Sequence, residues 1–222
     1  MAQDPYFSRP EVSNSDLSSL KQLLYPDGLT FGDKQKAYAF GTLLDNLITE
    51  PDKVDLFNLK VEYQDYPYTQ DDFDLALRMK RAYLKDPFCK MINDHADFQA
   101  ISVRHNWQIV YEGFEFQLDV RCKWDLLVRD WKMGGDIKST AAETQGQFEA
   151  ACEHFDYFRS RAWYMDIAGT DKDMLIGISK KNCKVFKIAI NRGDALYQKG
   201  KSEYQELAFK YWQLFDGIKL TA

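Results

Sequence analysis

The chain has 222 residues, of which 45% are hydrophobic and 15% aromatic, and its formal net charge is −5. This composition argues against a disordered chain and predicts a packed protein that forms a single domain over residues 1–222. No run approaches the roughly 18–20 apolar residues of a membrane span, and the first residues lack the charged-then-apolar pattern of a secretory signal. We therefore expect a soluble intracellular protein with no membrane partner.

The four cysteines and three histidines argue against most soft-metal sites. No two cysteines form a Cys-x-x-Cys pair, as a zinc ribbon or an iron–sulfur cluster would require, and a reducing compartment disfavours disulfides. The acidic net charge counts mildly against extensive non-specific binding to a nucleic-acid backbone. It counts less against a metal-dependent enzyme, because bound cations cancel part of the acidity where a phosphate would lie.

The first part of the chain predicts helices. Residues 13–24 combine a capping sequence with leucines at helical spacing, and a second helix is predicted over residues 35–48. Residues 50–74 are acidic and rich in tyrosine, and we expect a surface excursion there, either mobile or a flap over substrate. Apolar spacing over residues 75–86 then predicts another helix.

The second part predicts a sheet and more helices. Residues 98–128 alternate apolar and polar side chains, which predicts strands, and residues 124–140 complete the sheet as a hairpin. The period then becomes helical and predicts one long helix over about residues 148–165. Two further strands are expected within residues 174–189, and a final helix over about residues 204–215. This order predicts an α/β fold with a central mixed β-sheet flanked by helices.

The hairpin at residues 124–140 places charged side chains on strands. Asp136 and Lys138 are two residues apart, so they point to the same face of a strand. If the turn has four residues, Asp125 lies directly across from Asp136, whereas a two-residue turn makes them diagonal neighbours. Directly opposed Cβ atoms are roughly 4.5–5.5 Å apart, which suits two carboxylates that reach one hard cation at about 2.0–2.6 Å. A lysine beside two acids and a divalent ion is chemistry for an anionic substrate, with a phosphodiester as the candidate.

An Asp-x-Lys triplet has little specificity by itself. A second copy, at residues 130–132, lies in the predicted turn, where solvated charges are expected. The copy at residues 136–138 differs because it ends a strand and has Asp125 on the paired arm. The alternative for this copy is an ion pair at the edge of the sheet, and the spacing alone leaves both interpretations open.

Asp125 followed by residues 136–140 (Asp-Ile-Lys-Ser-Thr) resembles the signature of the PD-(D/E)XK nuclease superfamily. The similarity is closer to its phage and prophage exonuclease branch, related to exonuclease VIII (RecE-like). Residues 13–17 resemble the Ser-x-Ser-x-Leu helix start of that branch. Residues 41–51 resemble its Gly-Thr-x-x-His…Glu-Pro helix, and residues 157–166 resemble the segment with its Gln-x-x-x-Tyr motif. The resemblance rests on the shared order of these pieces and implies a restriction-endonuclease-like core.

The resemblance also implies the roles of the site residues. Asp125 and Asp136 would hold one or two Mg²⁺ or Mn²⁺ ions together with the backbone carbonyl of Ile137. Lys138 would orient the attacking water and stabilise the developing negative charge. Where the branch has a metal-binding histidine, this chain has Asp45, whose oxygens suit Mg²⁺ or Mn²⁺. The alternative is that Asp45 is a solvated helix acid and the site has lost a ligand.

The roles of two further residues and of one group of lysines are less well defined by the sequence. Where the branch has glutamine this chain has Ser160, which is shorter, while the tyrosine of the motif is retained as Tyr164; both are predicted to contact substrate. A group of lysines predicts either contacts to a duplex backbone or a plain exposed hairpin, and it comprises Lys180, Lys181, Lys184 and Lys187.

For function, the resemblance implies metal-assisted hydrolysis of phosphodiester bonds by an exonuclease acting on duplex DNA ends in phage-type recombination. DNA would be the substrate, a single-strand annealing protein a partner, and homo-oligomers the assembly. The location would be the cytoplasm of a bacterial host cell, phage-encoded proteins included. Two alternatives stay open, namely a catalytically inactive binding or structural protein of this fold and an endonuclease of the same fold.

Overall fold

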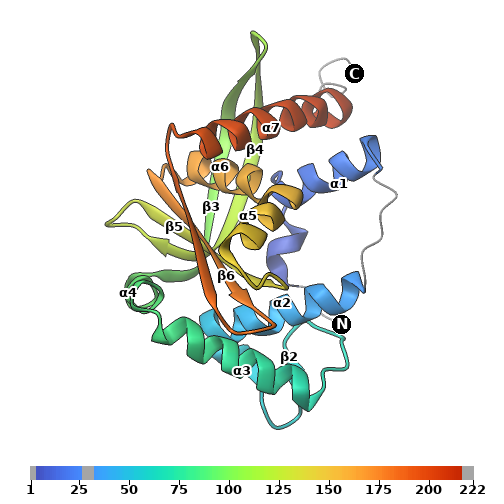
Figure 1. Ribbon diagram of the computed structural model, residues 1–222. Coiled ribbons are helices and arrows are strands. Elements are labelled where there is room, and N and C mark those ends of the chain that lie inside the picture. Colours follow the sequence, from blue (N-terminus) through green and yellow to red (C-terminus); the bar gives the residue numbers. More distant parts are fainter. Residues whose placement is uncertain (1–3, 27–32, 217–222) are drawn as a thin grey trace.

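The computed structural model describes residues 4–26 and 33–216, and Figure 1 shows their arrangement. Its central feature is a five-stranded sheet in the order β3-β4-β5-β6-β7. Neighbouring strands are antiparallel except for β5 and β6, which are parallel. The predicted α/β fold with a central mixed sheet is therefore confirmed. The strands span Asp97–Tyr111 (β3), Phe114–Val128 (β4), Met133–Thr140 (β5), Lys172–Ser179 (β6) and Val185–Asn191 (β7).

Helices flank this sheet, and short elements connect them. The α-helices of the described residues span Asn14–Leu24 (α1), Lys34–Thr49 (α2), Gln70–Lys85 (α3), Pro87–His95 (α4), Gln145–His154 (α5), Tyr157–Ala168 (α6) and Ala195–Tyr211 (α7). Short 3₁₀ turns span Pro5–Ser8 (η1) and Pro51–Lys53 (η2), and a π-helical stretch spans Trp212–Asp216 (η3). A separate hairpin pairs Val54–Asp55 (β1) with Lys60–Val61 (β2).

Two apolar clusters lie on opposite faces of the sheet. Leu175 and Ile176, which are adjacent in β6, belong to different clusters, as the alternation of strand side chains requires. One cluster packs α1, α5, α6 and α7 against the sheet. The other packs α2, α3 and α4, which lie in the lower part of Figure 1. The sheet is therefore the middle of three layers, and polar groups on either face are shielded from bulk water.

The predicted helix starts in the N-terminal part are confirmed. Ser13 and Asp16 form a capping box at α1, in which the Ser13 backbone N–H donates to Asp16 Oδ2 at 2.7 Å. The apolar stripe of α1 is shorter than predicted, because Leu17 and Leu20 are buried whereas Leu23 is 71% exposed. Helix α2 covers the predicted range and buries the side chains that face α3 and the sheet.

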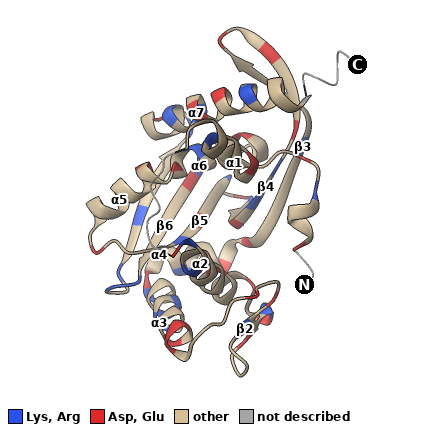
Figure 2. Cartoon of the chain, turned by 90° about the vertical axis from the view of Figure 1, so that its right-hand side faces the viewer, with Lys and Arg blue, Asp and Glu red and all other residues tan. Residues whose placement is uncertain are grey.

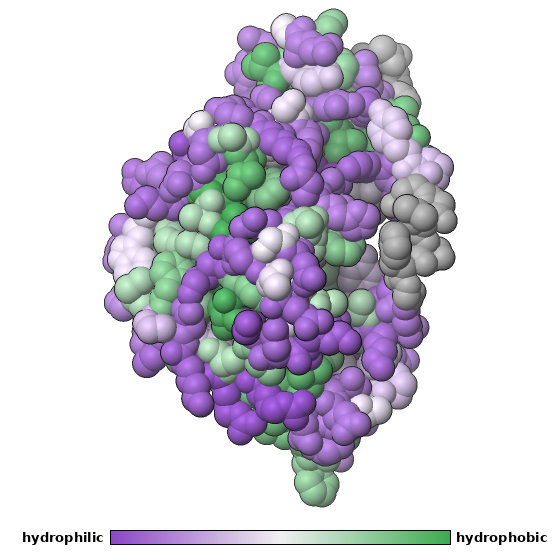
Figure 3. All heavy atoms as spheres, viewed as in Figure 1, coloured by the Kyte–Doolittle hydropathy of each residue, from purple (hydrophilic) through white to green (hydrophobic). Residues whose placement is uncertain are grey.

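The surface excursion predicted for residues 50–74 is shorter than expected. Helix α3 already begins at Gln70, capped by Thr69, and the preceding residues form η2 and the β1–β2 hairpin. Phe57 in the turn of this hairpin is 92% exposed, and Figure 3 shows apolar atoms at the lower tip of the molecule, where Figure 1 places this hairpin. Helix α4 was not predicted; Asp86 caps it by accepting from the backbone N–H groups of Phe88 and Cys89.

The single long helix predicted over residues 148–165 is wrong, because α5 and α6 are two helices. Asp156 between them has φ 55°, a left-handed conformation that ends a helix and that aspartate tolerates better than most residues. Its carboxylate is held by Lys21 at 2.6 Å and by Arg159 at 3.0 Å. Phe155, assigned to the apolar stripe, is 57% exposed. The break changes the direction of the chain, and α6 packs against β4.

Among residues 4–26 and 33–216, no helix combines the length and the apolar character needed to cross a bilayer. The final helix begins earlier than predicted, at Ala195, with Asp194 as its cap. The prediction of one domain concerns residues 1–222, which include positions outside the described ranges, and it stays a prediction.

Candidate active site

The candidate site lies where β4 and β5 separate. The turn between them spans residues 129–132 and is closed by a hydrogen bond from Lys132 N to Arg129 O of 2.9 Å, so it has the four residues of the first alternative. Backbone pairing runs from Val128↔Met133 to Leu126↔Gly135 and then stops. One step further, the side chain of Asp125 replaces the missing strand contact, because its Oδ2 accepts from the backbone N–H of Ile137 at 2.7 Å.

Asp136 is held by two cations. One of its carboxylate oxygens lies 2.6 Å from Lys138 Nζ, and the other lies 3.1 Å from Arg161 Nη1. Asp136 is 7% exposed and Arg161 is 1% exposed, so little water screens this contact. The Lys138 ammonium also lies 5.2 Å from the centre of the Tyr157 ring. The geometry therefore places Asp136 and Lys138 on the same side of the strand, with the ammonium directed at the carboxylates.

Asp45 reaches this region from α2. Its two carboxylate oxygens accept from the Gln99 side-chain amide at 3.3 and 3.0 Å, and the same amide contacts Thr49 Oγ1 at 3.0 Å. Gln99 belongs to β3 and has φ 51°, outside the strand region. The pairs on either side of it in the β3–β4 register place Gln99 opposite Asp125. We call the place where the pairing of β4 and β5 ends the fork. It brings together Asp45 from α2, Gln99 from β3, Asp125 from β4 and Asp136 from β5.

The charges of these groups are unevenly compensated. Burial and repulsion from Asp136 raise the pKa of Asp125 to about 6. Burial and repulsion from Asp125 raise the pKa of Asp45 well above its usual range. Burial also acts on Asp136, but Arg161 and Lys138 hold its pKa below the usual range. The pKa of Lys138 is raised, because Asp136 and Asp125 outweigh its burial. The ionised forms of Asp45 and Asp125 are thus disfavoured unless a further cation lies beside them.

These residues fit a hard divalent cation by donor type and charge. Across the described part of the chain, no three His, Cys, Asp or Glu side chains already stand close enough to form a metal-binding group. The charge of Asp125 nevertheless disfavours the ionised form of Asp45, and the charge of Asp136 disfavours that of Asp125, which is the condition that a bound cation relieves. Their oxygens are the ligands that Mg²⁺ and Mn²⁺ prefer. The fit is partial, because Asp136 is already engaged by two protein cations.

The two predicted substrate contacts have other partners in the fold. Ser160 Oγ donates to the backbone carbonyl of Tyr157 at 2.8 Å, within α6. The Tyr164 ring lies 4.1 Å from the Arg161 guanidinium and 5.2 Å from the Trp124 ring. Tyr164 therefore supports a residue that contacts Asp136, whereas no described contact joins Ser160 to the carboxylates. The substrate-binding roles of both residues stay predictions.

Three polar residues of the site were missed by the motif search. Gln99 holds Asp45, Arg161 contacts Asp136, and Asp173 lies 3.8 Å from the Arg161 Nε. Arg161 gave a usable signal, because a charged residue interrupts an otherwise apolar helix stripe between Phe158 and Ala162. Gln99 gave none, since its contact depends on an irregular strand conformation that periodicity cannot show.

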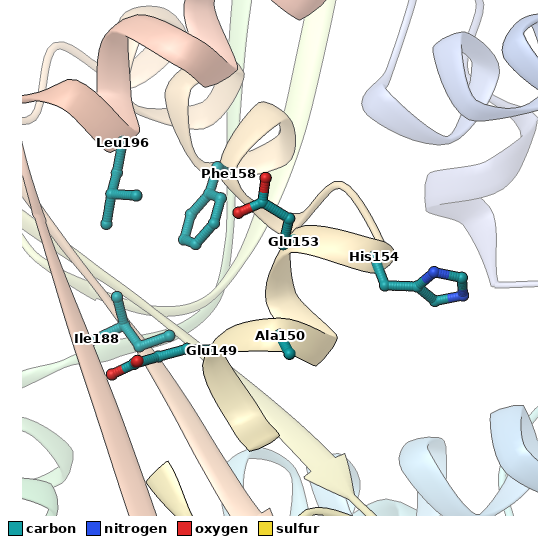
Figure 4. A pocket seen from close by; sticks show the side chains of 7 residues that line it. All are labelled: Glu149, Ala150, Glu153, His154, Phe158, Ile188 and Leu196. Carbon is teal, nitrogen blue, oxygen red and sulfur yellow. The ribbon is translucent and has the colours of Figure 1, made fainter. Parts of the chain in front are cut away.

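A cavity of about 780 Å³ lies apart from these carboxylates, between α5, β7 and α7. Figure 4 shows the apolar side chains of Phe158, Ile188 and Leu196 directed into it, with Glu149 and Glu153 at its side, whereas His154 points away. None of the residues at the fork lines it. The candidate site is therefore defined by the fork between β4 and β5 rather than by this cavity.

Lysines gather beyond the end of β5. The backbone N–H of Lys180 donates to Thr140 O at 2.8 Å, and Lys180 Nζ lies 5.5 Å from the Phe40 ring of α2. Burial and the charges of Lys36 and Lys181 lower the pKa of Lys180. Figure 2 shows basic residues in the loop at the lower end of β6. Within residues 4–26 and 33–216, Lys36, Lys180 and Lys181 have no ion-pair partner, whereas Lys187 pairs with Asp86.

Comparison with known proteins supports the fold. No family model and no curated protein matches the chain. The chain is similar to a solved structure from Eubacterium rectale, named as a provisional exonuclease, with a TM-score of 0.61 and 13% identity over 98% of this chain and 88% of that one. The two proteins share a fold. The restriction-endonuclease-like core that the motifs of the phage exonuclease branch imply is thereby confirmed as the fold of this chain.

Two further solved structures are similar at lower scores. One is a phage-related exonuclease from Haemophilus somnus 129PT, with a TM-score of 0.42 and 15% identity over 94% of this chain and 96% of that one. The other is an alkaline exonuclease from Laribacter hongkongensis, with a TM-score of 0.37 and 15% identity over 95% of this chain and 92% of that one. At these identities the likeness concerns the fold alone.

Proposed function

We propose that this protein is a Mg²⁺- or Mn²⁺-dependent deoxyribonuclease that hydrolyses phosphodiester bonds as an exonuclease on duplex DNA ends. The proposal rests on the fork between β4 and β5, where the ionised forms of Asp45 and Asp125 lack a sufficient counter-charge beside the Asp136–Lys138 pair. The fold shared with a protein named as an exonuclease supports it.

The protein groups divide the work of hydrolysis. A bound divalent cation supplies Lewis acidity and a water of lowered pKa. Asp125 and Asp45 would hold it, with Asp136 and the carbonyl of Ile137 as further donors. Lys138 stays protonated because Asp136 and Asp125 raise its pKa, so a fixed positive charge stands beside the phosphate oxygens where negative charge develops. The Tyr157 ring lies 5.2 Å from that ammonium, so a cation–π contact adds to the attraction of the carboxylates.

The wider biological setting follows from the motif resemblance. We place the activity in phage-type recombination in a bacterial cytoplasm, with a single-strand annealing protein as partner and a homo-oligomer as the working assembly. The first rival is a catalytically inactive protein of the same fold that acts as a binding or structural module, which Asp45 and Ser160 in place of the family residues would favour. The second rival is an endonuclease.

One assay separates the three functions. Linear duplex DNA and covalently closed circular DNA are incubated with the protein, with Mg²⁺, with Mn²⁺ and with a chelator. We expect the linear substrate to be degraded only with a divalent cation and the circles to stay intact. Cleaved circles would indicate the endonuclease. An inactive module would cleave neither substrate and would show no Mn²⁺-dependent rise in melting temperature that Asp136→Ala abolishes.

The unpaired lysines beyond β5 provide a second test, on DNA binding. Replacing Lys180 and Lys181 by alanine is expected to lower the slope of log affinity against log salt by up to about two, since each phosphate contact releases condensed counterions. The measurement is fluorescence anisotropy with labelled duplex in Ca²⁺ over a range of salt concentrations. Lys60→Ala with Lys172→Ala is the matched control, because both lysines are exposed and lie on other elements. An equal slope for both double variants would exclude a phosphate contact at Lys180 and Lys181.

A further inference from the structure

Arg161 is an unusual component of a cation-binding site. It is 1% exposed, and its guanidinium lies between the Tyr164 ring at 4.1 Å and the Trp124 ring at 5.3 Å. From this position it reaches Asp136 at 3.1 Å and Asp173 at 3.8 Å. Two aromatic rings and the packing of α6 enclose the side chain, so it cannot swing into solvent when another cation approaches.

The net formal charge of the aspartates, the lysine and the arginine at the site limits how many divalent ions can bind. Asp125 and Asp136 interact electrostatically with Asp45 and with Asp173, and the cations among these carboxylates are Lys138 and Arg161. With all four carboxylates ionised, the state that a bound cation favours, and with both protein cations charged, the formal charge is −2. One divalent ion neutralises that charge, whereas two would leave a site with little water at +2, which a medium of low dielectric strongly disfavours.

The contacts of Asp136 with Lys138 and Arg161 also favour a single divalent ion. A second divalent ion on the α6 side of Asp136 would have to displace Arg161 from the carboxylate oxygen that it contacts, whereas the other oxygen faces Lys138. Lys138 is 28% exposed on its side chain and has room to move, whereas the Arg161 side chain is 1% exposed and enclosed. The side of Asp136 that faces α6 is therefore permanently closed by a protein cation.

We propose that Arg161 is a positioning residue that takes the place of a second metal ion, so that the site binds a single divalent cation on its Asp45–Asp125 side. This inference rests on the proposed metal-dependent function and defines its metal stoichiometry. Arg161 fixes the Asp136 carboxylate, and Asp173 balances the charge of Arg161 from behind.

The test is a titration of the DNA-free protein with Mn²⁺, in which the electron paramagnetic resonance signal of the free ion measures binding. The wild type is expected to bind one Mn²⁺ per chain. Arg161→Gln is expected to bind a second Mn²⁺, because the loss of the guanidinium frees one oxygen of Asp136 and removes one positive charge. Arg161→Lys, which restores the charge, is expected to return to one ion.

Arg159→Gln is the matched control. Arg159 is also buried on α6, at 3% exposure, but it pairs with Asp156 and not with the site, so its variant should bind one Mn²⁺ with unchanged affinity. If Arg161→Gln fails to fold by circular dichroism, Asp173→Asn decides. In that variant Asp136 is the one remaining carboxylate that pairs with Arg161 among those at the site. Mn²⁺ binding should therefore weaken by about tenfold.

Two equivalent Mn²⁺ ions in the wild type would overturn the inference and leave the proposed function intact. Unchanged Mn²⁺ binding in folded Arg161→Gln, or in Asp173→Asn where the first variant does not fold, would overturn it as well. Absence of any Mn²⁺ binding would contradict both the inference and the metal-dependent function. The DNA cleavage assay tests the function alone, so the two failures are distinguishable.

Discussion

Replacing Lys138 by alanine is expected to reduce the rate of DNA cleavage by about 10²–10³-fold, the usual cost of removing one group aimed at charge that develops in the transition state. Lys138 Nζ lies 2.6 Å from Asp136, and the carboxylates keep it protonated across the neutral range, so the variant removes a full positive charge. Single-turnover cleavage of a linear duplex measures the chemical step, and Mn²⁺ titration of the same variant separates a loss of chemistry from a loss of metal.

The chain provides its own control for this experiment. Residues 130–132 repeat the Asp-x-Lys triplet in the turn between β4 and β5, where the Lys132 side chain is 68% exposed and lies 3.8 Å from Asp171. Lys132→Ala should leave the cleavage rate within about twofold of the wild type, because exposed ion pairs of this kind contribute little. Equal rates for wild type and Lys138→Ala would show that the assigned mechanism is wrong, and a large loss in Lys132→Ala would show that the two triplets were assigned the wrong way round.

The contrast between these two triplets shows what the sequence reveals. Strand alternation was sufficient to put Lys138 on the face of Asp136 and Asp125 near it. The sequence left the turn at two or four residues, and the observed four-residue turn decides that Asp125 lies across from Asp136. The shared face depends only on local geometry, which the residue order determines. The central sheet and the positions of α1, α2 and α3 follow from the same kind of local signal.

Relations that depend on irregular backbone were not predictable in this way. Core side chains of β4 change faces between Trp124 and Leu126, which belong to different apolar clusters although strict alternation would place them on one face. Asp125 lies between them, opposite Gln99 with its φ of 51°. A left-handed Asp156 likewise divides one predicted helix into two. Gln99 and Arg161 reach the site because of such irregularities. A periodic pattern contains no information about Gln99, and for Arg161 it shows only a charged residue on an apolar helix stripe.

Position 200 in α7 connects the fold to the site, and Gly200→Ala is expected to lower the free energy of unfolding by about 3 kcal/mol, at the upper end of the usual cost of overpacking. A Cβ at this position would lie 2.1 Å from the backbone carbonyl oxygen of Phe158 in α6. Backbone atoms cannot rotate away, so α6 and α7, which lie against each other in Figure 1, would have to separate. Urea denaturation of both proteins measures the difference.

Gly146→Ala is the control, because this glycine lies in the first turn of α5 and its Cβ would meet no atom within 4 Å. Alanine has the higher helix propensity, so this variant should be as stable as the wild type or more stable by up to about 1 kcal/mol. Since α6 also bears Arg161, separation of α6 from α7 should move the guanidinium relative to Asp136. Gly200→Ala should therefore alter Mn²⁺ affinity in protein that is still folded, whereas Gly146→Ala should not. Unchanged stability of Gly200→Ala would show that α6 and α7 are not packed through this position.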